Sequence, residues 1–394
     1  MRRTLLALAL TVVVAACGGG DGGDGDGADS FADGAAETTE PQTREPQTSA
    51  VPACTPAPLE QRAGRVLIVG LLPVRDAEHG LIGDILDVGV GGVLLLPPNV
   101  ASTEQVTALV AGIKQQAARP LLVVAGEESG RVSTFRTIFG PTPSARDLAA
   151  ANTPAQLTER AKEIGARMAS VGVNLDLAPV ADLDAGPARG IIGDRSFSAD
   201  PDRAGELALA WARGLHAAGV HPTAKHFPGH GRMQADSHRA LELLDTPLAE
   251  LEASDVKPFV RLIEAGVPAV LLDHIAYAAF DPDRPASLSP KAYAYLRELG
   301  FEGVAITDSV GMGAVNLRWP YPEAAVESII AGADAVLATD GAQARPMRDA
   351  LVAAVRDGRL PEARLNEAAG RVEALAGGDP EALVCVEVQA PTLR

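Results

Sequence analysis

The sequence predicts an α/β protein built as a single (β/α)8 barrel. Three observations favour this fold class. Eight short aliphatic runs alternate with amphipathic stretches over about 320 residues, which is a suitable length for such a barrel. The runs are continuous and apolar, as is typical of parallel strands buried on both faces. Apolar residues make up 47% of the 394 residues, but there are only 2 Trp, 4 Tyr and 8 Phe, so aliphatic side chains must fill a large core.

The predicted strands recur along the chain in a regular order. They are Arg65–Leu71, Gly92–Leu96, Leu121–Ala125, Val173–Ala178, Val220–Lys225, Ala269–Leu272, Val304–Thr307 and Ala335–Ala338. Gly172, Gly219 and Gly266 stand where a helix would end before the next strand. Ser102 and Gln105 form a capping-box pattern, so a helix is expected to follow. An open doubly wound sheet is the rival, but no glycine-rich nucleotide loop follows the first run, and a closed TIM-type barrel is expected.

The first 53 residues precede this barrel, which is assigned to residues 54–394. Residues 1–17 join two arginines to an apolar run that is too short for a bilayer, which predicts a signal peptide. The run ends in VAAC, the pattern of a bacterial lipobox, so lipidation of Cys17 is expected, with plain secretion as the alternative. Residues 18–53 are rich in Gly, Asp, Thr and Pro and predict a disordered acidic tether. We therefore expect an exported lipoprotein on the outer face of the cell membrane.

Charge and cysteine content narrow the classes of partner. The chain has 34 Lys and Arg against 51 Asp and Glu, a net charge of −17, which argues against nucleic acid and against a membrane partner beyond the lipid anchor. With Cys17 lipidated, Cys54 and Cys385 remain near the two ends of the folded part. They form either a disulfide, which export permits, or two free thiols. A monomer is expected.

The segment after the fifth run concentrates groups that can transfer protons. Residues 220–238 hold four of the seven histidines, and the sequence AKHFPGHGRMQADSH runs from Ala224 to His238. One interpretation makes His238 a general acid/base oriented by Asp236. A zinc site at His226 and His230 is a second, although Phe-Pro-Gly between them breaks the helix that would align them. Purely structural histidines are the third.

An acid/base group in a barrel needs a partner on the other side of its substrate. Asp308 directly follows the seventh run, at the rim where barrel enzymes carry their chemistry. It is the candidate nucleophile or base. The alternative is a cap for the turn that follows.

Several motifs together resemble glycoside hydrolase family 3, in particular its single-domain bacterial β-N-acetylglucosaminidase branch. The resemblance extends from about Val66 to about Ala374, in order and with compatible spacing. KHFPGHG followed by DSH is the most specific part. The motifs are KHFPGHG (225–231), DSH (236–238), ITDSVGM (306–312), NLDLAPVADL (174–183) and GDRSFSADP (193–201).

This resemblance implies a retaining glycosidase that releases terminal β-linked N-acetylglucosamine from cell-wall-type glycans through a glycosyl-enzyme. Asp308 matches the nucleophile, and His238 paired with Asp236 matches the acid/base. No cofactor and no metal are implied. Residues that match sugar-holding positions are Lys225, His226, Arg195, Arg131 and His274; for His274 a purely hydrogen-bonded supporting role is an equal alternative.

One segment departs from the family pattern. Where the family has a stretch like DQEGGRVxR, this chain reads GEESGRVST, with Gly126 and Thr134 in place of the Asp and the final Arg. Both family residues hold the sugar through charge-assisted hydrogen bonds. The departure leaves three functions open beside N-acetylglucosamine release: a β-glycosidase of other specificity, a phosphorylase that uses phosphate instead of water, or a catalytically weak glycan-binding lipoprotein.

Overall fold

The computed structural model describes residues 54–184, 186–233 and 240–394. The predicted signal peptide, Cys17 and the tether therefore lie outside the described residues. Eight parallel strands form one sheet in the order β12-β9-β7-β6-β3-β2-β1-β13, and a bridge between Ile306 and Ala335 joins its two ends. The strands are thus arranged in chain order around a closed barrel, which confirms the predicted fold class.

The barrel strands match the eight predicted runs. They are β1 (Leu67–Gly70), β2 (Gly92–Leu94), β3 (Leu122–Ala125), β6 (Leu175–Asp176), β7 (His221–Phe227), β9 (Ala269–Leu272), β12 (Val304–Thr307) and β13 (Val336–Ala338). The fourth is shorter than its run, although the N–H groups of Asn174 and Leu177 on either side of it still donate to the neighbouring strand β3. The shorter strands are β4 (Glu127–Ser129), β5 (Val132–Ser133), β8 (Leu243–Leu244), β10 (Ala276–Tyr277) and β11 (Asp281–Pro285).

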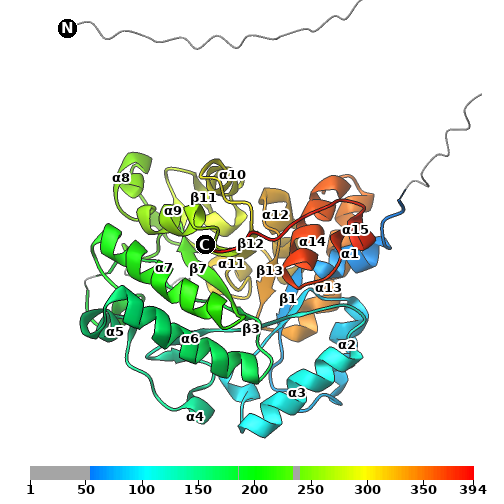
Figure 1. The fold of residues 1–394 in the computed structure, drawn as a ribbon. Helices are drawn as coiled ribbons and strands as arrows, with labels where there is room; N and C mark the ends of the chain where they lie inside the picture. Colours follow the sequence, from blue (N-terminus) through cyan, green and yellow to red (C-terminus); the bar gives the residue numbers. More distant parts are fainter. Residues whose placement is uncertain (1–53, 185, 234–239) are drawn as a thin grey trace, which may run out of the picture. The chain divides into compact units, whose positions relative to one another are not determined.

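Helices surround the strands (Figure 1). They are α1 (Leu59–Arg65), α2 (Gly80–Val88), α3 (Thr103–Gln116), α4 (Arg136–Phe139), α5 (Ala145–Ala151), α6 (Pro154–Ser170), α7 (Pro201–Ala217), α8 (Leu248–Ala253), α9 (Lys257–Glu264), α10 (Pro290–Glu298), α11 (Gly313–Asn316), α12 (Tyr321–Ala331), α13 (Ala344–Arg356), α14 (Glu362–Leu375) and α15 (Pro380–Val384). Ser102 caps α3 by accepting from Gln105 N, as predicted. In the described part of the chain, no helix is both long and apolar enough to cross a membrane.

The core has two layers, as parallel strands covered by helices require. Alternate strand residues such as Ile68, Val124 and Ile306 pack together inside the barrel. Their neighbours, such as Val69 and Ala305, pack outward against the helices. Because both faces of each strand are buried, the strands read as continuous apolar runs in the sequence.

A buried carboxylate lies where the barrel closes. Asp334 accepts from Ala305 N (3.0 Å), Arg297 (2.5 Å), Arg364 (2.6 Å) and Arg371 (3.1 Å). Burial alone would raise the pKa of Asp334, but the three guanidinium groups outweigh it and hold the pKa below its ordinary value. This ion-pair cluster ties α10 and α14 to the junction between β12 and β13.

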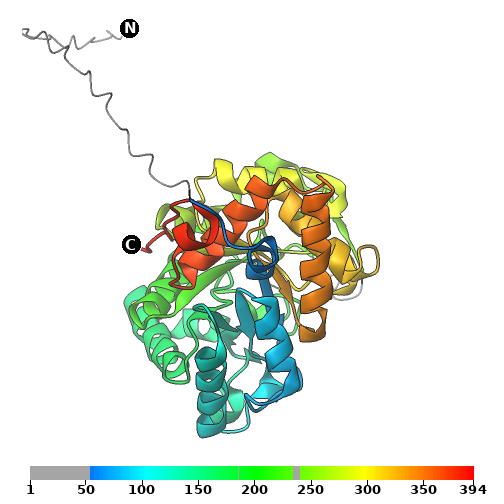
Figure 2. The ribbon, with the colours of Figure 1, turned by 90° about the vertical axis from the view of Figure 1, so that its right-hand side faces the viewer.

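A disulfide joins the two ends of the described domain. Cys54 and Cys385 are bonded, with Cα atoms 5.7 Å apart. Figure 2 shows the blue start of the domain beside its red C-terminal segment. Of the two possibilities left open by the sequence, the structure has the disulfide.

Candidate active site

Polar side chains gather where the barrel strands end. Glu128 follows β3, Lys225 and His226 lie near the end of β7, and Asp308 follows β12. Because all eight strands are parallel, their carboxyl ends meet at one rim, and residues far apart in the chain come together there. Arg195 reaches the same place from the long connection between β6 and α7.

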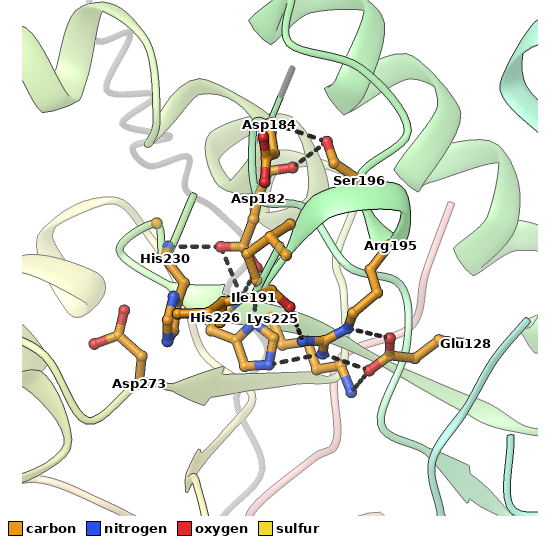
Figure 3. A network of polar contacts seen from close by, with 12 residues as sticks. Glu128, Asp182, Asp184, Ile191, Arg195, Ser196, Lys225, His226, His230 and Asp273 are labelled. Atoms are coloured by element: carbon orange, nitrogen blue, oxygen red, sulfur yellow. Dashed lines mark hydrogen bonds and ion pairs between the residues drawn. The ribbon is translucent and has the colours of Figure 1, made fainter. Parts of the chain in front are cut away.

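The carboxylate of Glu128 is held between two cations (Figure 3). Arg195 donates to it with two nitrogens, Nε to Oε2 at 2.6 Å and Nη2 to Oε1 at 2.7 Å, and Lys225 Nζ also contacts Oε1. Glu128 is only 4% exposed. Burial by itself would raise the pKa of Glu128, but Arg195 and Lys225 outweigh it and keep the pKa far below its ordinary value. The three side chains form a fixed unit, called here the Glu128 clamp.

His226 lies between Asp182 and the Glu128 clamp. Its Nδ1 is 2.6 Å from Asp182 Oδ2, and its Nε2 is 3.3 Å from Arg195 Nη2. A guanidinium has only donors, so Nε2 of His226 is the accepting nitrogen. Nδ1 carries the hydrogen and donates it to Asp182 in a hydrogen bond. Both ring nitrogens thus face protein groups, and neither is directed to a metal as the zinc interpretation requires.

Asp182 organises this part of the rim. It also accepts from the backbone N–H of His226 (3.2 Å) and of His230 (2.7 Å), as Figure 3 shows. Burial alone would raise the pKa of Asp182, but its interactions with His226 and His230 lower the pKa below the usual value. One carboxylate therefore fixes both the His226 ring and the turn that contains His230.

Asp308 has the properties of an ionised nucleophile. Its N–H donates to Leu272 O (2.9 Å), and its Oδ1 accepts from Ser309 N (2.7 Å). Burial would raise the pKa of Asp308, but His274, His226 and Lys225 nearby lower it below the ordinary value. Helix α11 begins only at Gly313, with Met312 as its N-cap, so Asp308 is not a helix cap. Its contact with Ser309 N lies at the start of the intervening turn and is compatible with the turn-capping alternative.

The side chains of His274 and Arg131 contact backbone groups of the protein. His274 is fully buried, with Nδ1 2.6 Å from Ser287 Oγ and Nε2 2.9 Å from Ser309 O, which favours the supporting role over contact with a sugar. Arg131 bonds Asp194 (2.8 Å) and the carbonyls of residues 190–192. Its guanidinium therefore fixes the segment that presents Arg195. The expected sugar contact of Arg131 stays a prediction.

The departure at Gly126 and Thr134 leaves the clamp intact. Thr134 Oγ1 lies 3.1 Å from Gly126 O and 3.3 Å from Gly126 N, which closes the hairpin of β4 and β5. A Cβ added at Gly126 would meet no atom of the described residues within 4 Å, so this part of the structure leaves open space in front of Gly126. The hairpin keeps Glu128 in place without either family residue.

Sequence reasoning missed one central residue. Glu128 was not among the expected site residues, although it follows the third predicted strand as Asp308 follows the seventh, and that position was the available signal. Asp236 and His238 were expected to be catalytic, and they lie outside the described residues.

Comparisons with known proteins agree with this site. A family model described as the glycosyl hydrolase family 3 N-terminal domain matches residues 59–375. The beta-hexosaminidase LpqI of Mycobacterium tuberculosis is 34% identical over 390 residues, which is 95% of this chain and 97% of that protein. A solved glycosyl hydrolase of this family from Mycobacterium smegmatis has a TM-score of 0.76 at 35% identity, covering 81% of this chain and 97% of its own.

A further solved structure extends this agreement. It is a beta-N-acetylhexosaminidase from Beutenbergia cavernae, with a TM-score of 0.76 at 32% identity, covering 82% of this chain and 99% of its own. The region that the family model matches, residues 59–375, includes every described residue of the rim. The predictions of a glycosidase and of its family are confirmed. The chain belongs to glycoside hydrolase family 3.

Proposed function

We propose that the protein is a retaining β-N-acetylglucosaminidase that releases the terminal sugar from cell-wall-type glycans. The observation that carries this proposal is Asp308, held ionised at the rim beside the Glu128 clamp. The names of the similar proteins support the choice of sugar. No cofactor is part of the proposal.

Two displacements at the anomeric carbon account for the reaction. In the first, Asp308 bonds to the anomeric carbon while the bond to the leaving oxygen breaks, and His238 supplies the proton that this oxygen takes up. In the second, His238 removes a proton from water, the water oxygen bonds to the same carbon, and Asp308 leaves. Two inversions retain the configuration. Asp236 orients His238 in this scheme.

The Glu128 clamp would present donors to the sugar. Because Glu128 fixes Arg195 and Lys225, their N–H groups meet sugar hydroxyls without first losing side-chain freedom. Lys225 also helps to keep Asp308 ionised. Binding and nucleophile activation thus share one cation.

A second candidate is a β-glycosidase of other specificity. The open space in front of Gly126 favours it, because a sugar with a different or larger group on that side would be accommodated there. A phosphorylase and a catalytically weak glycan-binding lipoprotein remain outcomes of the assay. Aryl β-N-acetylglucosaminide and aryl β-glucoside, each with and without phosphate, separate N-acetylglucosamine release, glucoside hydrolysis and phosphorolysis. No turnover of either substrate would point to another sugar or to the glycan-binding lipoprotein.

Replacing the nucleophile tests the mechanism. Asp308→Ala should lower kcat by at least about a thousandfold, because no glycosyl-enzyme forms. Added azide should restore turnover and give a product of inverted configuration, which proton NMR identifies. A variant with wild-type activity, or one that azide does not rescue, would argue against Asp308 as the nucleophile. Unchanged thermal unfolding is the control for folding.

Replacing His238 tests the acid/base role. His238→Ala should slow alkyl glycosides far more than activated aryl glycosides, because only a poor leaving group needs the proton. The ratio of kcat/KM for the two substrates is the measurement. Equal losses on both would contradict the assignment.

Neutralising the clamp tests its part in binding. Glu128→Gln should lower kcat/KM by roughly 5- to 100-fold, because Arg195 and Lys225 lose the charge that holds them. Glu206→Gln is the matched control, since Glu206 also binds an arginine at 2.6 Å but lies on the surface. Losses of equal size in the two variants would contradict the role of the clamp.

The same variant predicts a pH dependence of stability. The pKa of Glu128 is lower in the folded than in the unfolded protein. The wild type should therefore have a larger free energy of unfolding than Glu128→Gln. This difference should be complete above about pH 5 and should shrink as the pH falls toward the pKa of Glu128 in the folded protein. Urea unfolding at a series of pH values measures it.

We also propose that residues 18–53 tether the barrel, as a monomer, to a lipid at Cys17 on the outer face of the membrane. The support is the sequence VAAC at the end of the apolar run. Cys17→Ala should move the protein from the membrane fraction to the soluble fraction. Continued membrane association of this variant would contradict lipidation at Cys17.

A further inference from the structure

One buried carboxyl group at the rim has no part in the reaction above. Asp273 directly follows β9 and is 0% exposed. Its Oδ1 accepts from Ile275 N at 3.1 Å, and its Oδ2 lies 2.6 Å from Tyr277 Oη. Its backbone N–H donates to Phe227 O at 3.1 Å, and Figure 3 shows the side chain on the same side of the rim as His230. It therefore borders the turn that contains His230.

The Tyr277 hydroxyl stands between two acceptors. Besides Asp273 Oδ2, it lies 3.0 Å from the carbonyl oxygen of Gly229. A tyrosine hydroxyl carries one proton and donates to one of them. The carbonyl has no proton to give. For both short contacts to be hydrogen bonds, the second proton must therefore come from the carboxyl group of Asp273.

The charges around Asp273 favour the same proton. The carboxylates of Asp182 and Asp308 face it, and burial together with these two charges raises the pKa of Asp273 well above its usual range, although Tyr277 and Ile275 oppose the shift. Burial and the nearby Asp273 also raise the pKa of Tyr277, so the tyrosine keeps its proton.

Among the described residues, the other charged groups near the rim have partners other than Asp273. Arg195 and Lys225 are bound to Glu128. Asp255, which also acts on Tyr277, is paired with Arg232 at 2.8 Å. Burial and the neighbouring His226 lower the pKa of His230 to about 4, so its ring adds no positive charge at neutral pH.

We propose that Asp273 is a neutral carboxylic acid that donates a hydrogen bond to Tyr277 Oη. Tyr277 then donates its own proton to Gly229 O in a hydrogen bond and positions the turn formed by residues 228–231. The turn is also fixed at His230, whose N–H donates to Asp182. It precedes the segment with Asp236 and His238 by a few residues, so the effect on catalysis rests on the proposed function. Asp273 and Tyr277 are positioning residues.

The proton is tested without any substrate. Between about pH 5 and 7 the unfolded chain has lost this proton and the folded protein keeps it, so stability falls as the pH rises. The unfolding equilibrium constant of the wild type, measured in urea, should increase about tenfold per pH unit relative to Asp273→Asn. The infrared C=O band of a protonated acid should be present in the wild type at pH 7 and missing from Asp273→Asn. Equal pH dependence with no such band would overturn the neutral acid.

The positioning role is tested with Tyr277→Phe. Its matched control is Tyr293→Phe, since Tyr293 is also buried and donates to a backbone carbonyl, Ser287 O, at 3.0 Å. Tyr277→Phe should lower kcat roughly 5- to 100-fold on alkyl glycosides and much less on activated aryl glycosides. Asp273→Asn should keep most activity, because its amide donates to Tyr277 Oη in place of the acid.

Amide hydrogen exchange separates failure of this role from failure of the proposed function. Exchange in residues 227–233 should be faster in Tyr277→Phe than in Tyr293→Phe, whether or not a glycoside is turned over. Equal exchange and equal substrate ratios in the two variants would overturn the positioning role. A wild type inactive on every glycoside would remove the proposed function, and exchange would still decide the inference.

Discussion

The rim of this barrel depends on one buried carboxylate, Glu128. A buried charge without partners is expensive, and two cations in contact with the same carboxylate offset that cost. Arg195 comes from the connection between β6 and α7, and Lys225 lies in strand β7. The hairpin after β3, the segment before α7 and the end of β7 must therefore converge. The geometry of the donors that we propose for the sugar follows from that convergence.

Four carboxyl groups share this small region, and their surroundings assign each a different state. Glu128 and Asp182 are ionised because cations and N–H donors surround them. Asp308 is ionised beside His274, His226 and Lys225, which suits a nucleophile. The charges of Asp182 and Asp308 act on buried Asp273, and none of the described residues forms an ion pair with it, so a proton lowers its energy. Separating the pKa values of neighbouring carboxyl groups is a general means of giving them different roles.

The fold could be predicted because a strand that is buried on both faces has a continuous apolar sequence. Eight such runs, alternating with helices, indicate a closed barrel. The site could be predicted only in part. Asp308 and Lys225 were visible because polar residues at strand ends are costly unless used. Arg131 and His274 turned toward backbone, and a linear sequence does not encode that direction. Glu128 binds Arg195, which is 67 residues away in the chain. Tyr277, the partner of Asp273, contacts Gly229, which is 48 residues away. Only the closed barrel brings these groups together.

The change at Gly126 and Thr134 bears on specificity rather than on the catalytic framework. Thr134 closes the hairpin through the backbone of Gly126, and the clamp on Glu128 needs neither of the side chains that the family pattern has there. Asp308 and Asp182 contact other elements of the rim. Among the described residues, the change leaves open space in front of Gly126. On the proposed function, an enzyme altered in this way would keep Asp308 and the two cations of the clamp, and the change would bear on which sugars it accepts.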